Sequence, residues 1–421
     1  MTPARHAALR SVVVVALVLA ACGDDAPTTT TATDAPPLAE LLVERLPPDS
    51  PDAAALAAGL NEVGYDLFAH AAGEADGAGV VLSPLSIGLA LGMADAGASG
   101  ATADALEALF AYPVGGDARL AAFNTLEQSV TGVADATVRL ANRQFPDTGF
   151  VTVDGYDETL ARFFDARVEP LPLQADPEGS RARINDFVAE QTEDLIPELL
   201  PEGMVNPASV LFLVNALYLE ADWAKPFGKY STEDAAFTRL DGTEVTVPLM
   251  HELELTGPAV VTDDYAATEV PYAGDDLSML VIVPAEGRYE AVEADLDGDL
   301  VAEVDDAAVP GPVELFLPRF ESTTNLDLRA GFEGIGVDGI FDAPYDGIAP
   351  GITLESGVHA ADITVDEAGT VAAAATGLDF AESGPPVPDI VVRADRPFLY
   401  VIRHQPTGAV LFVGRVLDPS A

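Results

Sequence analysis

The segment Asp366–Phe380 reads DEAGTVAAAATGLDF, with four consecutive alanines between Thr370 and Thr376. Alanine has the highest helix propensity of the amino acids. Gly369 and Gly377 flank the run, however, and glycine weakens a helix, while the neighbouring valines and threonines are β-branched and favour strands. The pattern therefore indicates a segment that can be coil in one state and strand in another.

The rest of the 421-residue chain is strongly acidic, with 69 acidic and 20 basic residues and a formal net charge of −49. A field of this sign repels nucleic acids and anionic membrane surfaces over a Debye length of about 8 Å at physiological salt. The hydrophobic fraction of 49% is ample for a large core. The composition predicts a globular protein and argues against a nucleic-acid partner.

Residues 1–21 have the layout of a secretory signal peptide, in which Arg5 and Arg10 precede the apolar stretch SVVVVALVLAA. That stretch is shorter than the roughly 20 residues that a membrane-spanning helix needs. The sequence LAAC at Leu19–Cys22 resembles a bacterial lipoprotein signal box, in which the cysteine becomes the lipidated first residue after cleavage. An ordinary signal peptide followed by a stray cysteine is the alternative. We therefore expect a secreted, cell-surface lipoprotein, on the extracellular or periplasmic side, that meets the membrane only through a lipid anchor at Cys22.

Residues 22–50 are rich in Thr, Pro, Ala and Asp, which predicts a flexible, acidic tether between the anchor and the domain. Residues 51–421 contain no comparable linker and no internal repeat, so we expect them to form a single domain. Helical spacing dominates the first third of this domain, as in Asn61–Gly73 and in the helix that Ser83 and Pro84 are suited to begin.

Strand patterns dominate the remainder of the domain. Apolar runs at 136–145, 209–219, 277–284 and 313–320 predict strands, and residues 397–419 predict a buried hairpin joined at HQPTG. An amphipathic helix, interrupted at Pro197, is predicted at Arg183–Leu200. Helices followed mainly by strands indicate an α+β domain built around large sheets.

Enzyme signatures are mostly absent from the sequence. It contains no G-x-S-x-G motif, and its five histidines lack metal-binding spacing. GIGVDG at Gly334–Gly339 matches a dinucleotide pattern but follows a helix-like segment instead of a strand, so we do not interpret it as a nucleotide site. DLDGDL at Asp295–Leu300 has its glycine misplaced for a calcium loop and is better explained as a surface turn. We expect no catalytic residue, no metal and no cofactor.

Seven motifs in order make the chain resemble the serpins, from about Asn61 to Pro419. They are VVLSPLSIGLALGMADAGASGAT, ANRQF, RARINDFVAEQTEDLI, VLFLVNALYLEADW, VPYAGDDLSMLVIVP, VHAADITVDEAGTVAAAAT and RPFLYVIRHQPTGAVLFVGRVLDP. The resemblance implies three β-sheets with about nine helices and an exposed reactive-centre loop. It also implies a mechanism in which a protease cleaves the loop and is trapped as an acyl-enzyme, while the loop inserts into the main sheet as a strand.

The resemblance assigns roles to individual positions. Glu367 matches the base of the loop, and the hinge that follows comprises Gly369, Thr370, Ala372, Ala373, Ala374, Ala375 and Thr376. A polar cluster beneath the opening point of the main sheet comprises Ser83, Ser86, Asn215 and His359, although His359 alone could be read as an ordinary core histidine. Trp223 and Arg319 match the top of that sheet, where Arg319 is expected to pair with Glu367. Ala368, Val371 and Glu193-Asp194 depart from the usual family pattern without disabling the hinge.

The loop sequence favours an inhibitor over a non-inhibitory relative. Alternate residues of a strand face the same side, so an inserted loop would bury Thr370, Ala372, Ala374, Thr376, Leu378 and Phe380, none of which is charged. The other set contains one charge, Asp379, which we expect on the outer face. A buried charge or a bulky hinge residue would cost several kcal/mol.

The spacing usual in the family, counted from Glu367, places the scissile bond at Ser383–Gly384. The stretch is longer than in some relatives, so the window comprises Phe380, Ala381, Glu382, Pro385 and Pro386 as well. Small Ser383 suits an elastase-like or subtilisin-like protease, and Phe380 suits a chymotrypsin-like one. No basic residue occurs between Glu367 and Ile390, so trypsin-like enzymes are not expected targets.

The sequence thus predicts a monomeric inhibitor of serine proteases, not an enzyme, with cysteine proteases as a further candidate class. The alternative is a non-inhibitory serpin-fold protein that binds other molecules or acts as a chaperone.

Overall fold

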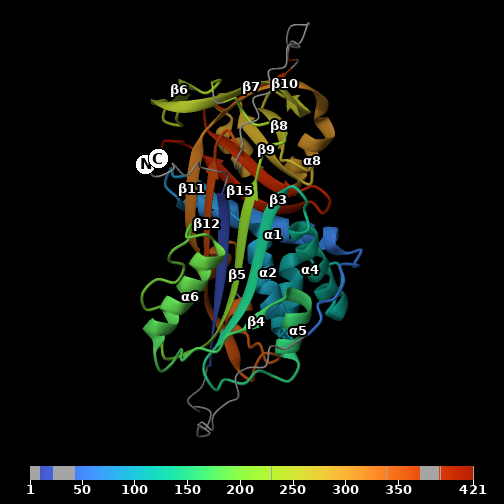
Figure 1. The fold of residues 1–421 in the computed structure, drawn as a ribbon, viewed down its shortest axis with the longest axis vertical. Coiled ribbons are helices and arrows are strands. Elements are labelled where there is room, and N and C mark those ends of the chain that lie inside the picture. The colour runs from blue at the N-terminus through green and yellow to red at the C-terminus, as the bar shows by residue number, and fades with distance from the viewer. Residues whose placement is uncertain are drawn as a thin grey trace, which may run out of the picture.

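A computed structural model of the chain describes residues 10–21, 43–228, 230–337, 339–369, 388 and 390–420 (Figure 1). The described helices are α1 (Ala53–Glu74), α2 (Pro84–Asp95), α3 (Ala101–Phe110), α4 (Gly116–Thr131), α5 (Tyr156–Phe164), α6 (Pro177–Gln191), α7 (Tyr289–Ala294), α8 (Gly298–Ala307), α9 (Leu328–Gly334) and α10 (Gly339–Asp342). The described strands are β1 (Arg10–Ala21), β2 (Val80–Leu82), β3 (Ala136–Pro146), β4 (Arg167–Val168), β5 (Ser209–Ala221), β6 (Glu233–Thr238), β7 (Glu244–Val261), β8 (Tyr265–Pro271), β9 (Leu277–Pro284), β10 (Val309–Pro318), β11 (Phe320–Asp327), β12 (Ile352–Val365), β13 (Ile390–Arg393), β14 (Phe398–His404) and β15 (Ala409–Val416).

The described strands form two hydrogen-bonded sheets. The main sheet has the order β11-β12-β1-β5-β3-β4, and the second has the order β13-β10-β7-β8-β9-β14-β15-β2, with β6 beside β7. The 18-residue β7 pairs with β6, β10 and β8 along successive parts of its length. β7 therefore connects strands that were expected to form separate sheets. The predicted α+β class is confirmed.

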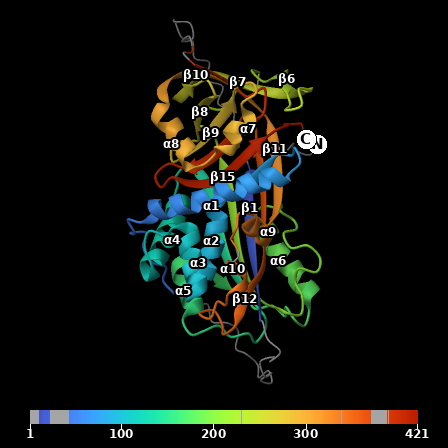
Figure 2. The same cartoon turned by 180° about the vertical axis from the view of Figure 1, so that it is seen from behind.

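Helices cover both faces of the main sheet (Figures 1 and 2). One face packs on the large core that includes α1, α2 and α4, as well as strands of the second sheet. The other face packs on a smaller cluster centred on α6, which contributes Ile184, Phe187 and Val188. The central strands of the main sheet are consequently buried on both sides.

The structure confirms several elements that were predicted from local sequence signals. Ser83 caps α2, because its Oγ accepts a hydrogen bond from the Ser86 N–H at 3.1 Å, and Pro84 fills the first helical position. The predicted C-terminal hairpin is present as β14 and β15, which pair from Phe398 to His404. The predicted helix at Asn61–Gly73 lies within the longer α1.

Both predicted boundaries of one helix are wrong. The sequence analysis placed a helix at Arg183–Leu200, but α6 spans Pro177–Gln191. It begins earlier because Asp176 caps it by accepting a hydrogen bond from the Gly179 N–H at 3.1 Å. It ends before Leu200 because Glu193 and Asp194 adopt positive φ angles of 51° and 64°, which a right-handed helix cannot contain.

The centre of the main sheet holds an unexpected strand. The apolar part of the predicted signal peptide forms β1, which pairs antiparallel with both β5 and β12 (Figure 1, dark blue). The side chains from Ser11 to Leu19 are fully buried. In the chain that retains its first 21 residues, this segment therefore lies in the middle of the fold, while residues 1–9 and Cys22 lie outside the described residues.

The last part of the predicted tether contacts the domain. The Leu46 N–H donates to the Arg162 carbonyl at 3.3 Å, and Arg45 reaches Glu127 of α4. The packed region thus begins before residue 51, and residues 23–42 lie outside the part of the chain that the structure describes. Within that part no helix is both long and apolar enough to cross a membrane, and no group of His, Cys, Asp and Glu could hold a metal ion.

Candidate functional site

The end of β12 carries the predicted base of the loop, and an ion pair anchors it. Arg319 donates from Nε to Glu367 Oε2 at 2.8 Å and from Nη2 to Glu367 Oε1 at 2.5 Å, so the expected Arg319–Glu367 pair is present. Thr232 donates to the same carboxylate at 2.5 Å. Burial alone would raise the pKa of Glu367, but these hydrogen bonds outweigh it and lower the pKa, which keeps the carboxylate charged.

Trp223 ties the same segment to the end of β5. Its indole Nε1–H donates to the Asp366 carbonyl at 3.0 Å, and its backbone N–H donates to the Ala368 carbonyl at 3.2 Å. The indole stacks on Tyr272 with centroids 4.4 Å apart and is 2% exposed. The loop base is thus fixed at the top of the main sheet, directly above the strands β5 and β12.

Gly369 is the last described residue of this anchor, and the backbone there requires a glycine. Its φ angle is +68°, a region that residues with a Cβ adopt at a cost. A Cβ at this position would lie 2.2 Å from the Trp223 backbone nitrogen and 2.7 Å from the Asp222 carbonyl carbon. The close approach of two backbones therefore fixes the point at which the chain leaves the sheet.

The four residues of the predicted polar cluster come together below the centre of the main sheet. The Ser83 N–H donates to His359 Nε2 at 3.2 Å, and the Ser86 hydroxyl donates to the Asn215 side-chain oxygen. All four residues are fully buried. They come from three elements, with the two serines at the start of α2, Asn215 on β5 and His359 on β12.

His359 leaves one hydrogen-bonding group unused. Burial lowers its pKa to about 3, so the imidazole is neutral. Because Nε2 accepts a hydrogen bond, the ring proton belongs on Nδ1, and Nδ1 is buried with no partner among the described residues. In register, His359 lies opposite Val15 of β1, an apolar side chain that offers no acceptor.

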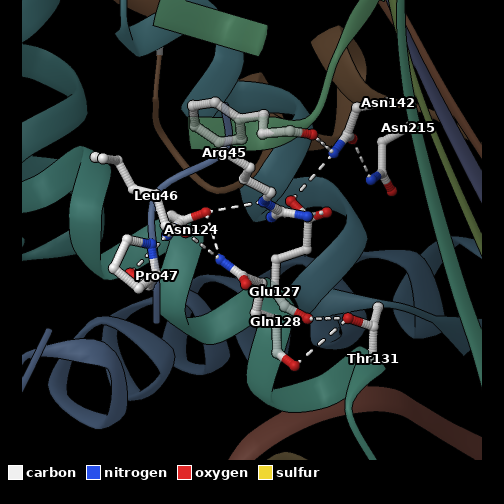
Figure 3. Close-up of polar contacts among 10 residues, drawn as sticks. Arg45, Leu46, Pro47, Asn124, Glu127, Gln128, Thr131, Asn142 and Asn215 are labelled. Atoms are coloured by element: carbon white, nitrogen blue, oxygen red, sulfur yellow. Dashed lines mark hydrogen bonds and ion pairs between the residues drawn. The ribbon is translucent and has the colours of Figure 1, made fainter. Parts of the chain in front are cut away.

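The polar cluster continues to the protein surface through residues that the sequence analysis did not single out (Figure 3). Asn215 Nδ2 donates to the Asn142 side-chain oxygen at 2.8 Å, and Asn142 Nδ2 donates to Glu127 at 3.2 Å. Arg45 Nη2 lies 3.1 Å from the other Glu127 oxygen. A polar chain thus connects the segment before α1 with the centre of the sheet, and long sequence separation hides it from any local motif.

Glu127 is the buried acid in this series of polar contacts. Burial raises its pKa to about 8, against the opposing effects of Arg45 and Asn142. The folded state therefore holds a proton on Glu127 that the unfolded chain, with an ordinary pKa of 4.5, has already lost. Where the folded state binds more protons, stability falls as pH rises.

The position between β5 and β12 is a slot for one strand. From Ser11 to Ala20, β1 pairs with Ile363 to Thr353 on β12 and with Leu219 to Ser209 on β5. Val13, Val15, Leu17 and Leu19 face the large core, while Val12, Val14, Ala16 and Val18 face the cluster under α6. A strand in this slot must therefore be uncharged on its core face and small or apolar on the other.

The remaining predicted site residues lie outside the described residues. These are the hinge from Thr370 to Thr376, the whole window Phe380–Pro386 with the Ser383–Gly384 bond, and Cys22.

Gly369→Ala should destabilise the fold by about 2 kcal/mol or more, because it adds backbone strain to a clash with the Trp223 backbone. Gly77→Ala is the matched control, since Gly77 has φ +81° but no heavy atom within 4 Å of the added Cβ, and should cost only about 1 kcal/mol. Urea unfolding measures both. Equal effects of the two substitutions would refute the close approach.

Glu127→Gln should change the pH dependence of stability, because glutamine cannot titrate. Between about pH 4.5 and 8 the wild-type protein should lose stability relative to the variant as pH rises, and the difference should level off above 8. Glu107→Gln, which removes the same charge from a side chain that is 62% exposed, is the control. Denaturant titrations at several pH values give the measurement, and a constant wild-type-to-variant difference would contradict the assignment.

Comparison with known proteins gives the family. Residues 58–419 match the family model described as serpin (serine protease inhibitor). The chain is 31% identical over 370 residues to an uncharacterised serpin-like protein of Thermococcus kodakarensis, covering 86% of this chain and 85% of the relative. It is 32% identical over 381 residues to the leukocyte elastase inhibitor of Bos taurus, covering 86% and 99%.

Solved structures agree with this fold. Uncleaved ovalbumin matches with a TM-score of 0.76 and 24% identity, over 86% of this chain and 100% of that one. Native protease nexin-1 with heparin matches with a TM-score of 0.74 and 24% identity, over 87% and 99%. From the match over residues 58–419, together with the anchored loop base and the slot in the main sheet, we conclude that this chain belongs to the serpin family.

Proposed function

We propose that this protein inhibits serine proteases by covalent trapping, with insertion of its loop into the main sheet. The observation that carries the proposal is the match between the slot and the loop sequence. Serpins are generally protease inhibitors rather than enzymes, and the residues that distinguish an inhibitor are those of the loop.

The proposed register of insertion starts from the described end of β12. If the chain turns through Asp366–Gly369, Thr370 pairs with Val365, and the antiparallel ladder then brings Ala374 opposite Ala361 and Thr376 opposite His359. These are the partners of Val13 and Val15 in β1. The set Thr370, Ala372, Ala374, Thr376, Leu378 and Phe380 would thus face the large core, as the alternation predicts.

The loop would satisfy a group that β1 leaves unpaired. At the position of Val15, the Thr376 hydroxyl would lie opposite His359 and could accept a hydrogen bond from Nδ1–H, which has no partner among the described residues. A satisfied buried donor is worth roughly 1–3 kcal/mol relative to an orphaned one. The polar cluster therefore favours the loop over an all-apolar strand.

The face of the slot under α6 would bury a charge of the loop that was expected to lie outside. The sequence analysis placed Asp379 on an outer face, but in this register it takes the place of Val18, which is fully buried. Ala373, Ala375 and Gly377 are small enough for the space under α6. Insertion beyond Gly377 therefore carries a desolvation cost for the Asp379 carboxylate.

Location and target are proposals as well. Cleavage before Cys22 would leave a lipidated first residue on a tether, with the inhibitor domain at the cell surface as a monomer. β1 ends at Ala21, so this cleavage removes the whole strand and vacates the slot. A small residue at Ser383 and the likeness to the leukocyte elastase inhibitor support an elastase-like or subtilisin-like target.

Ala374→Glu should abolish trapping, whereas Ala374→Val should retain it. Glutamate would bring a charge into the large core, and valine is the residue that fills the same position in β1. Each protein, starting at Cys22, is incubated with elastase, subtilisin and chymotrypsin, and SDS-stable complexes are quantified. Cleavage of the wild-type loop without any complex, and with no rise in thermal stability afterwards, would instead support a non-inhibitory binding protein.

Trypsin-like proteases should form no stable complex, because the segment between Glu367 and Ile390 contains no basic residue. Mass spectrometry of the released C-terminal peptide, after reaction with the three other proteases, should place the cleaved bond within Phe380–Pro386. A stable complex with an arginine-specific protease would overturn this prediction.

A further inference from the structure

We infer that the slot between β5 and β12 is a binding site for the chain's own N-terminal segment Ser11–Ala20, and that this segment blocks loop insertion for as long as it stays attached. The blocking role rests on the proposed function. The position of the segment in the slot does not depend on it. The occupant is already seated in the structure, so the site and its ligand are both described.

The backbone pairing of the segment is complete on both sides. β1 forms antiparallel ladders with β12 and with β5 along its whole length, with one register shift in each ladder, after Val18 and after Leu19. β1 therefore pairs with β12 from Ile363 onward and with the facing edge of β5, so that an inserting loop would meet an occupied edge beyond Thr364. A second strand cannot enter until the first one leaves, because a ladder position accepts one partner only.

The side chains of the segment fit both faces of the slot. Leu17 lies over Gly357, where even a Cβ would come within 2.9 Å of the leucine Cδ2. On the other face, Ala16 and its valine neighbours pack in the cluster under α6. Nine consecutive residues, Ser11 to Leu19, carry no charge and are fully buried, which is the pattern that a slot between two covered faces requires.

Two buried polar atoms show where the fit is imperfect. The Ser11 hydroxyl and His359 Nδ1 both lack a hydrogen-bond partner among the described residues. The segment thus occupies the slot through apolar packing and backbone pairing, and it does not satisfy the polar cluster. The segment thus holds the sheet in its six-stranded form and leaves His359 Nδ1–H for an inserting Thr376 to satisfy.

The base of the loop keeps its anchoring contacts while β1 occupies the slot. Glu367, Trp223 and Gly369 hold the end of β12 above β1 without contributing to the slot itself. Removal of residues 1–21 would therefore open the slot directly beneath an anchored loop. The N-terminal segment would make the unprocessed chain inactive as an inhibitor, and its cleavage at the end of β1 would activate it.

The position of the segment is tested by cross-linking in the full chain with Cys22→Ser. Val13→Cys with Leu217→Cys places two thiols at directly paired positions and should form a disulfide in high yield. Val13→Cys with Leu211→Cys is the control, because Leu211 pairs with Leu19 at the far end of the strand. Equal or negligible yields from both pairs would overturn the binding site.

The blocking role is tested with the full chain and the double variant Val13→Asp with Leu17→Asp, which places two charges on the core face of β1. The variant should form at least tenfold more SDS-stable complex with the susceptible protease than the unsubstituted full chain. Ala7→Asp with Ala8→Asp adds the same charge outside the strand and should change nothing. Equal complex yields from the full chain and the β1 variant would overturn the blocking role.

The two proposals fail in different ways. If the chain starting at Cys22 traps a protease but the full chain traps it equally well, the blocking role is wrong and the inhibitor function stands. If the Val13–Leu217 disulfide forms but no form of the chain traps any protease, the binding site stands and the proposed inhibitor function is wrong.

Discussion

The main sheet depends on one constraint, which is that the facing edges of β5 and β12 must both be paired. Each edge presents backbone amides and carbonyls in a region that is covered on both faces, and unpaired groups there cost free energy. The structure meets this constraint with a strand that is distant in sequence from both neighbours. The loop that follows β12 has an uncharged alternating set, from Thr370 to Phe380, that matches the core face of this strand.

The polar cluster connects this pairing constraint with the proposed function. Ser83, Ser86, Asn215 and His359 lie where the slot crosses the start of α2, and their hydrogen bonds join α2 to the two strands that flank the slot. Through Asn142 and Glu127 the cluster extends to Arg45, which lies in the last part of the predicted tether. The state of the sheet is therefore connected with the N-terminal region in two ways, by the strand β1 and by a chain of buried polar groups.

Some features could be predicted from the sequence because they rest on short-range patterns. Ser83 and Pro84 mark the start of α2, and the alternating apolar residues of 397–419 mark the final hairpin. The resemblance placed Arg319 opposite Glu367 although 48 residues separate them. The end of α6 was missed, because positive φ angles at Glu193 and Asp194 have no signature in residue type.

The sequence by itself determined the family and the residues that anchor the base of the loop, because these depend on residue identity and order. The tertiary structure decided which segment fills the slot, because pairing of β1 with β5 and β12 joins residues about 200 and 340 positions apart, and no local pattern encodes such register. It also decided that Glu127 is a buried acid and that His359 Nδ1 has no hydrogen-bond partner among the described residues. Burial and hydrogen bonding depend on the neighbours that pack around a residue, and the identity of the residue does not reveal them.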